Sequence, residues 1–486
     1  MFSTGSITLQ ERNKTKSSFV SSLLFRFCIS VVAILIALIV SFNTQDLLGN
    51  KYLFLLPLLY GVLFFLMPSL WNHSKGNVGM TILNLVLFMR YVVSPLFRSL
   101  SINEPNIRGK VPTDTGLNYG MFMMIAELLV VFFVVELFAE KFYREKNKTR
   151  TLFRPLNNKF ILTMVLFLGI SLLLIFPELR ERYNFFIVTE AIENLTLDIP
   201  LDGIILMITD LVFIIFPVIM IDFFKKKYEK IPHFKYVVFS LLSMLPVITF
   251  FKGTSRFSVV VPTIAFMVIL LKLYPEYKKR LGVIIGSVLL IVFSSFSLYK
   301  QFGYTQGSDI DMSMNTNEIA YNLDAYMSGP DNMGRVIDLN NAYGSNITLE
   351  TLKNDIFNNV ALLSGLSDSR NTTSAWFNMF LYGNNEVTDQ IVPLSGQSFL
   401  HFGSLGMPIL MIITIMLMMF FDSKIKYENR IEYVYLYVYI VMYMSMAMMV
   451  SFGSIYPIFT NLFIPILVIF AMNRKLSLRK KNDRSG

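Results

Sequence analysis

Apolar residues run through this chain in long stretches, and polar residues are confined to short intervals between them and to one long one. Twelve apolar runs approach or reach about 20 residues, the length that crosses a hydrocarbon core of roughly 30 Å as a helix. They cover residues 20–42, 53–71, 78–97, 118–139, 160–177, 203–224, 237–251, 257–275, 281–299, 397–421, 432–451 and 456–472. The seventh run is short and can be read with the eighth as one broken hairpin. The pattern predicts an all-α polytopic membrane protein with about 12 transmembrane helices.

The long polar interval spans residues 300–396. After Lys300 it holds eleven acidic residues against three basic ones. Its apolar positions between 349 and 363 recur at helical spacing, which predicts short helices in one large extracytoplasmic loop. We therefore expect helices one to nine in residues 1–299, the loop in 300–396, and helices ten to twelve with a basic cytoplasmic tail in 397–486.

Composition and charge set the class of protein and its orientation. Of 486 residues, 54% are hydrophobic and 16% are charged. A soluble domain carries about 25% charged residues, so a soluble enzyme is excluded. With both termini in the cytoplasm, the inside segments hold 29 of the 43 Lys and Arg residues. The net charge of +10 is thus explained by topology, with no need for nucleic acid as a partner. One Cys and three His offer little for a metal site, and we expect no metal and no cofactor.

Two arginines near the external end of the third run are candidate ligands for an anion. Arg90 lies within the run and Arg98 at its exit, eight residues and roughly 12 Å of helix further on. Both guanidiniums can therefore line one side of an outward-open site. The alternatives are that Arg90 pairs with a buried acid such as Glu127 or Asp210, and that Arg98 reaches the lipid headgroups.

A second basic pair flanks the turn between the seventh and eighth runs. In the sequence from Lys252 to Arg256, Gly253 permits a tight turn and Thr254 or Ser255 can cap the following helix. The helix start and the two cations suit a phosphate or pyrophosphate at the outer face. The alternative is an ordinary basic turn that touches lipid phosphates.

A base for proton abstraction has several candidates. His401 enters the tenth run near the outer surface, where an imidazole titrates near neutral pH. A structural histidine packed among aromatic residues is the alternative. The large loop supplies further candidates, namely Asp309, Asp311, Asp324, Asp331 and Asp389.

Three short segments resemble the bacterial oligosaccharide repeat-unit polymerases, the Wzy-type O-antigen and capsule polymerases. The first is Met89-Arg90-Tyr91 with the Pro95-Leu96 that follows, and the second is the turn from Lys252 to Arg256. The third runs from Asp389 to Pro393 and continues to Gly396, Phe402-Gly403 and Gly406. The resemblance implies a bundle like that of GT-C membrane glycosyltransferases.

The resemblance also implies a reaction. A growing glycan passes from undecaprenyl pyrophosphate to the non-reducing end of another lipid-linked repeat unit, at the outer face of the bacterial cytoplasmic membrane. The implied roles are pyrophosphate binding by Arg90, Arg98, Lys252 and Arg256, catalysis by His401, Asp309 or Asp389, and glycan binding by Tyr326, Arg335, Arg370 and Trp376. The implied partners are the lipid-linked oligosaccharide, the bilayer and a chain-length regulator protein. A flippase or other transporter of lipid-linked oligosaccharides and an O-antigen ligase remain as alternatives.

Overall fold

The computed structural model of the chain describes residues 4–45, 48–101, 109–144, 154, 156, 159–181, 183–185, 202–252, 257–288, 316–358, 360, 363–384 and 390–482. Asp309, Asp311, Asp389 and Arg256 lie outside these residues, and the side chain of Lys252 is also not described.

The first part of the chain is built from helices and one short two-stranded ladder. Its elements are α1 (Thr4–Thr44), η1 (Leu48–Asn50), α2 (Leu55–Leu66), α3 (Ser69–Ser74), α4 (Val78–Phe88), η2 (Met89–Val93), α5 (Ser94–Leu100), α6 (Asp114–Tyr143), α7 (Phe160–Ile175), α8 (Glu178–Glu181), β1 (Tyr183–Phe185), α9 (Asp202–Lys230), α10 (Phe234–Leu242), α11 (Leu245–Thr249), β2 (Phe250–Lys252), α12 (Phe257–Leu273) and η3 (Pro275–Tyr277), followed by a helix over 278–288. The strands β1 and β2 are antiparallel.

The second part begins with short polar helices and returns to apolar ones. Its elements are α14 (Thr316–Met327), α15 (Pro330–Tyr343), η4 (Gly344–Asn346), α16 (Leu349–Phe357), η5 (Ser364–Leu366), η6 (Ser369–Asn371), α17 (Thr373–Tyr382), α18 (Leu394–Gly406), α19 (Ile409–Tyr427), α20 (Ile431–Ser445), η7 (Ala447–Met449), α21 (Phe452–Pro457), η8 (Ile458–Phe463) and α22 (Ile464–Asn482).

The fold is that of an all-α membrane protein. Within the described residues, six helices are long and apolar enough to cross a membrane, or up to eight if each of two bent helix pairs counts as one span. Within the described residues, each of the twelve predicted runs contains helix, although residues 289–299 of the ninth run lie outside them. The helices α7, α10–α11 and α20 are shorter than a full span. The predicted number of twelve spans is therefore not confirmed.

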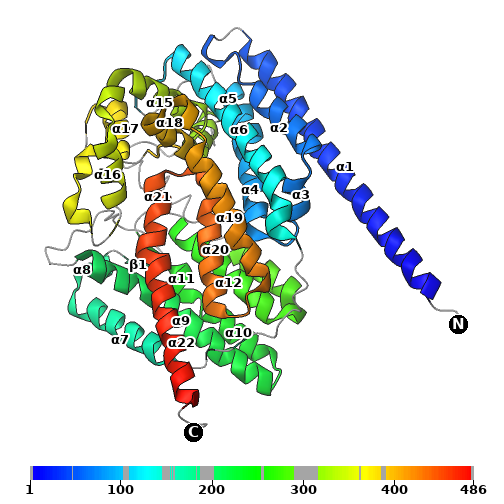
Figure 1. Ribbon diagram of the computed structural model, residues 1–486, viewed down its shortest axis with the longest axis vertical. Helices are drawn as coiled ribbons and strands as arrows, with labels where there is room; N and C mark the ends of the chain where they lie inside the picture. Colours follow the sequence, from blue (N-terminus) through cyan, green and yellow to red (C-terminus); the bar gives the residue numbers. More distant parts are fainter. Residues whose placement is uncertain are drawn as a thin grey trace.

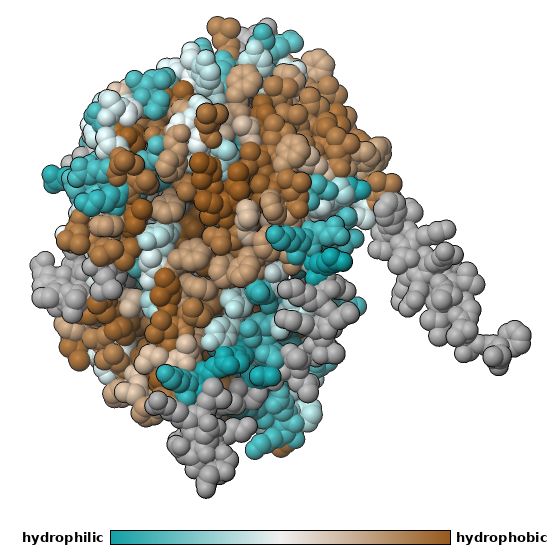
Figure 2. All heavy atoms as spheres, viewed as in Figure 1, coloured by the Kyte–Doolittle hydropathy of each residue, from teal (hydrophilic) through white to brown (hydrophobic). Residues whose placement is uncertain are grey.

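Apolar side chains cover the flanks of the bundle and polar ones its two ends. On α1, large hydrophobic residues such as Leu24, Leu35 and Phe42 are exposed over the whole span. Figure 2 shows hydrophobic residues across the middle of the molecule and hydrophilic ones over α16 and at the lower ends of the long helices. This is the distribution expected of surface that faces lipid.

The short helices α14–α18 form a layer at one end of the bundle, called the polar layer below (Figure 1). Both chain ends point away from this layer. Although α15 is polar in sequence, its residues from Pro330 to Leu339 are all buried. The helix lies against α6, where a Cβ on Gly120 would come within 2.6 Å of the Gly334 nitrogen. Two glycines thus let the two backbones touch, in the manner of small-residue contacts between membrane helices.

The tenth predicted run, 397–421, is not one continuous helix. It divides into α18 and α19, which are bent by 112° with respect to each other. Gly403 inside α18 has a φ of +68°, and Pro408, which has no N–H to donate, precedes α19. As a result, α18 belongs to the polar layer and α19 to the bundle.

The glycine contact gives a first prediction. Gly120→Ala should lower the stability of the protein by about 1–3 kcal/mol, because the new methyl group would overlap backbone atoms that cannot rotate away. The measurement is thermal unfolding of the purified protein in nanodiscs. Gly282→Ala is the control, since a Cβ there meets nothing within 4 Å. Equal melting temperatures for G120A and the unmodified protein would refute the close contact.

Candidate functional site

Arg90 is fully buried. It sits in η2, a π-helical turn between α4 and α5, of a kind that often marks functional sites. Its Nη2 donates to Oε2 of Glu127 over 3.1 Å. Its Nη1 donates to the backbone carbonyls of Met327 and Met448. The guanidinium is therefore held by a carboxylate and two carbonyls from three other parts of the chain.

Both backbone carbonyls that Arg90 contacts belong to an irregular or terminal piece of backbone. Met327 ends α14, and Met448 lies in the short turn η7 between α20 and α21. Glu127 also accepts a hydrogen bond of 2.7 Å from the hydroxyl of Ser395, in the first turn of α18. Pairing with a buried acid is thus what the structure shows for Arg90, in place of the predicted exposure to a pyrophosphate.

Arg98 forms a second charged group, one turn beyond Ser94 on α5. Its Nη1 makes an ion pair with Asp331 and lies 4.0 Å from Oδ1 of Asp324, while Nε donates to Asn50 over 3.0 Å. Side-chain exposure is 13% for Arg98 and 10% for Asp331, so this group reaches the surface of the layer. Arg98 is thus already paired with carboxylates of the protein, and its guanidinium is not a free cation for an anion such as pyrophosphate.

Asp324 is the carboxylate whose protonation is most perturbed in this group. Burial and the neighbouring charge of Asp331 raise its pKa to about 7, against the opposing effects of Arg98 and Arg335. A carboxylate that titrates near neutrality is suited to accept a proton from a substrate. Asp324 and Asp331 are thus the two of the five predicted acidic candidates that the described structure brings to one arginine.

Arg335 belongs to the same polar layer. It is buried, and it donates from Nε to the Lys110 carbonyl and from Nη1 to Oδ1 of Asn332, each over 3.1 Å. Tyr326 is two residues from Asp324 on α14 and is 38% exposed. Of the predicted glycan-binding residues, these two lie on the elements that carry the Arg98 group.

His401 is part of a separate hydrogen-bonded network. Its Nε2 lies 2.9 Å from the Thr373 hydroxyl and 3.3 Å from Oδ2 of Asp355. Asp355 also accepts from Gln397 over 2.8 Å, and Gln397 in turn accepts from the backbone N–H of Phe452. With a side chain only 1% exposed, His401 ties α16, α17, α18 and α21 together and does not face solvent.

The other two predicted glycan-binding residues lie on the segment from η6 to α17. Arg370 is exposed. Trp376 is partly buried, donates from Nε1 to Asn371 over 2.9 Å and has its ring centroid 5.8 Å from that of Tyr343. It packs against a small core that includes Phe377 and Phe380, apart from the main core of the bundle.

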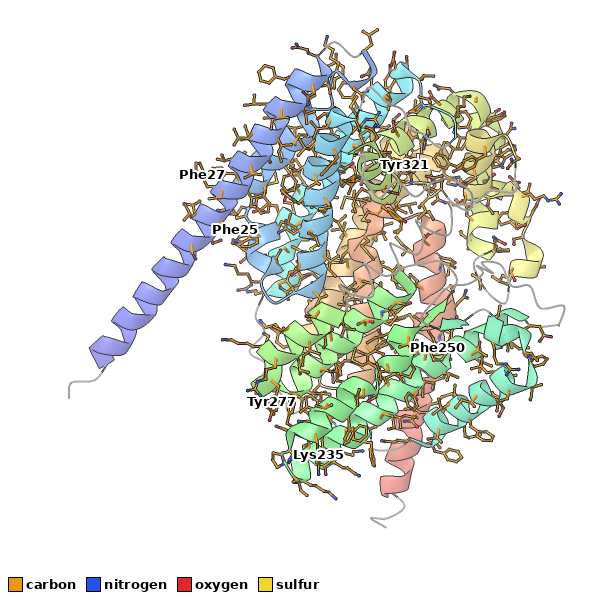
Figure 3. All side chains as sticks on the ribbon, turned by 180° about the vertical axis from the view of Figure 1, so that it is seen from behind. Phe25, Phe27, Lys235, Phe250, Tyr277 and Tyr321 are labelled. Carbon is orange, nitrogen blue, oxygen red and sulfur yellow. The ribbon has the colours of Figure 1, made fainter. Side chains whose placement is uncertain are left out.

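The predicted basic turn is framed by defined elements on both sides. Lys252 ends β2 opposite Tyr183 of β1, and α12 begins at Phe257. A helix therefore does follow the turn, as the sequence predicts. Figure 3 places Phe250 of β2 between Tyr321 of α14 and the opposite ends of the helices, marked by Lys235 and Tyr277.

Several residues of these networks were not identified from the sequence. No spacing in the sequence links Ser395, Gln397, Thr373 and Asp355, because they are spread over the three helices α16, α17 and α18. The polarity of Ser395 and Gln397 just before an apolar run was the available signal. Among the described residues, no group of three or more His, Cys, Asp or Glu is arranged to hold a metal ion.

A double-mutant cycle tests the central pair. Arg90→Met should destabilise the protein by about 3–5 kcal/mol, because it leaves the Glu127 carboxylate buried without its cation. Glu127→Gln should also be destabilising, and the double variant should lose less than the sum of the two. Unfolding in nanodiscs measures the coupling, and strictly additive losses would contradict a direct interaction.

Asp324 gives a pH-dependent prediction. Because its folded-state pKa is above the unfolded value, the folded state binds the proton more tightly, and stability falls as pH rises from about 4 to about 7. Asp324→Asn removes this contribution and should flatten the melting temperature between pH 5 and pH 8. Equal pH slopes in both proteins would show that this carboxyl group is not perturbed.

Comparison with known proteins yields no match to a protein-family model, a curated protein or a solved structure. The function of the chain therefore has to be inferred from its own residues.

Proposed function

We propose that this protein is a membrane glycosyltransferase that polymerises lipid-linked oligosaccharide repeat units. It would transfer a glycan from undecaprenyl pyrophosphate to the non-reducing end of another lipid-linked unit, at the outer face of the bacterial cytoplasmic membrane. The observation that carries the proposal is the convergence of Asp324 and Asp331 on Arg98, where the polar layer meets the end of an apolar span.

The charges of this group suit the acceptor side of the reaction. Asp324, with a pKa near neutrality, is the proposed general base, and Arg98 keeps the two neighbouring carboxylates from repelling each other. The acceptor hydroxyl gives its proton to Asp324 as its oxygen bonds to the anomeric carbon of the donor. The bond from that carbon to the pyrophosphate oxygen breaks, and the pyrophosphate leaves with the electron pair.

The donor side needs cations that are not already balanced by acids of the protein. Lys252 and Arg256 remain the candidates, since Arg90 and Arg98 have internal carboxylate partners. The position of β2 and the start of α12 next to this turn supports the proposal, because a helix N-terminus favours an anion. His401 is assigned a structural part in this scheme, holding α18 in place through Asp355.

Two variants test the two sides separately. Asp324→Asn should reduce the rate of chain elongation by about 10²–10⁴-fold. The unmodified protein should elongate faster as pH rises through 7, because its base ionises there, and the residual activity of the variant should not show this increase. Glu350→Gln, at an exposed carboxylate on α16, is the matched control and should elongate normally. The measurement is the rate of glycan elongation on purified lipid-linked repeat units.

Arg256→Ala should abolish elongation in cells while single repeat units still reach the outer leaflet on their lipid carrier. Glycan length profiling measures elongation, and leaflet-specific labelling measures whether the single units reach the outer leaflet. Units trapped on the inner leaflet would favour a flippase instead. Normal long chains on the lipid carrier, with none passed to a final acceptor, would favour a ligase.

A further inference from the structure

The chain from Phe402 to Leu405, at the corner between α18 and α19, forms an exposed tip, called the α18 tip below. All four of its residues are exposed, and Leu405 at 97% is the most exposed large hydrophobic side chain in the described part of the chain. A single leucine in water is common on protein surfaces and supports no inference by itself. The position of this one relative to the lipid-facing surface makes it informative.

The α18 tip continues an apolar stripe that runs along α19. The exposed large hydrophobic side chains of this helix recur every three or four residues and therefore share one face. They are Ile409, Ile413, Leu417 and Phe420. Figure 2 shows hydrophobic residues over α19, so this face belongs to the flank of the bundle that we assign to lipid.

The backbone places Leu405 on the same face. Gly403 is the residue inside α18 whose dihedral angles are not helical, whereas Met407 and Pro408 both have dihedral angles of the αR region. The chain therefore changes direction at Gly403 and is close to helical from there into α19. Leu405 lies four residues before Ile409, which is about one helical turn, so it extends the stripe beyond the first residue of α19.

Two close contacts fix the α18 tip. The Ser398 hydroxyl donates to the Gly406 carbonyl over 2.8 Å, which joins the middle of α18 to its last residue. A Cβ on Gly406 would lie 2.1 Å from the Cβ of Phe402, so the chain folds tightly on itself there. The hydrogen bonds of Gln397 and His401 in turn hold α18 to its neighbours. The tip thus projects in a defined direction.

We infer that the α18 tip is inserted in the lipid leaflet next to the polar layer, so that α18 lies along the membrane surface. A helix bent by 112° from a membrane-crossing helix lies close to the membrane plane. Residues 402–409 carry no charge, and Phe402 and Leu405 are of the types that insert at the boundary between headgroups and acyl chains. With Lys424 and Lys426 of α19 at the cytoplasmic side, as the sequence predicts, this leaflet is the outer one. The insertion does not depend on the proposed glycosyltransferase activity.

A depth measurement on the full chain in nanodiscs tests the insertion. Cys28 is the single cysteine of the chain, so Cys28→Ser together with Leu405→Cys leaves one site for an NBD fluorophore. The variant should fold, because a side chain that is 97% exposed makes few packing contacts. Nitroxide lipids labelled near the headgroup should quench this fluorophore about threefold or more as strongly as a water-soluble nitroxide does, since the tip lies below the headgroups.

Leu349→Cys on α16 and Leu366→Cys in η5, each in the Cys28→Ser protein, are the matched controls. Both leucines are largely exposed and belong to the polar layer, but hydrophilic residues cover α16 in Figure 2. Their labels should be quenched more by the soluble nitroxide than by the lipids. The same preference in the L405C label would place the tip in water and overturn the inference. Protection of that label from both quenchers, with disulfide cross-linking of two L405C chains, would also overturn it and make the tip a contact between copies.

Discussion

A guanidinium enclosed among apolar helices needs a counter-charge and acceptors for its N–H groups, because lipid and core side chains offer neither. In this protein, Arg90 receives a carboxylate from α6 and carbonyls from the end of α14 and from η7. Carbonyls inside a regular helix are already bonded, so these acceptors exist only where helices end or break. The buried arginine therefore depends on these free carbonyls for acceptors, and the carbonyls depend on the arginine for donors.

The need of Arg90 and Glu127 for hydrogen-bond partners also explains why polar helices enter the bundle. The end of α14 and the first turn of α18 reach Arg90 and Glu127, and α15 follows α14 onto the face of α6. Backbone contact at Gly120 and Gly334 makes room for α15, and Asp338 completes the contact by accepting hydrogen bonds from the N–H and hydroxyl of Thr113 at the start of α6. The polar layer is thus fixed to the bundle by bonds to charged and capping groups.

The position of α14 and α15 has a consequence for chemistry. Once these helices are placed by Arg90 and by the glycine contact, Asp324 and Asp331 have to lie beside Arg98, where they are partly removed from water. Burial and mutual repulsion make the Asp324 carboxylate a weaker acid. The site that results holds two carboxylates beside Arg98, and it is separated in the chain from the basic turn at Lys252. We relate the first to a sugar acceptor and the second to a phosphate-bearing donor.

The sequence by itself determined the class of the molecule and many of its parts. Long apolar runs are sufficient to predict membrane helices, since every backbone group in lipid must be bonded within a helix. The helical spacing of apolar positions between 349 and 363 predicted short helices in the interval from 300 to 396. It also gave Glu127 as an alternative partner of Arg90. Only the tertiary structure decided that Arg90 and Arg98 have internal acidic partners, that Asp324 and Asp331 share one guanidinium, and that His401 is enclosed by Asp355 and Thr373. The widest of those contacts joins Arg98 and Asp331, more than two hundred positions apart, and no local pattern of polarity or spacing encodes which helices will touch. The bend between α18 and α19 was missed for a similar reason, because hydropathy averages over Gly403 and Pro408 and records no change of direction.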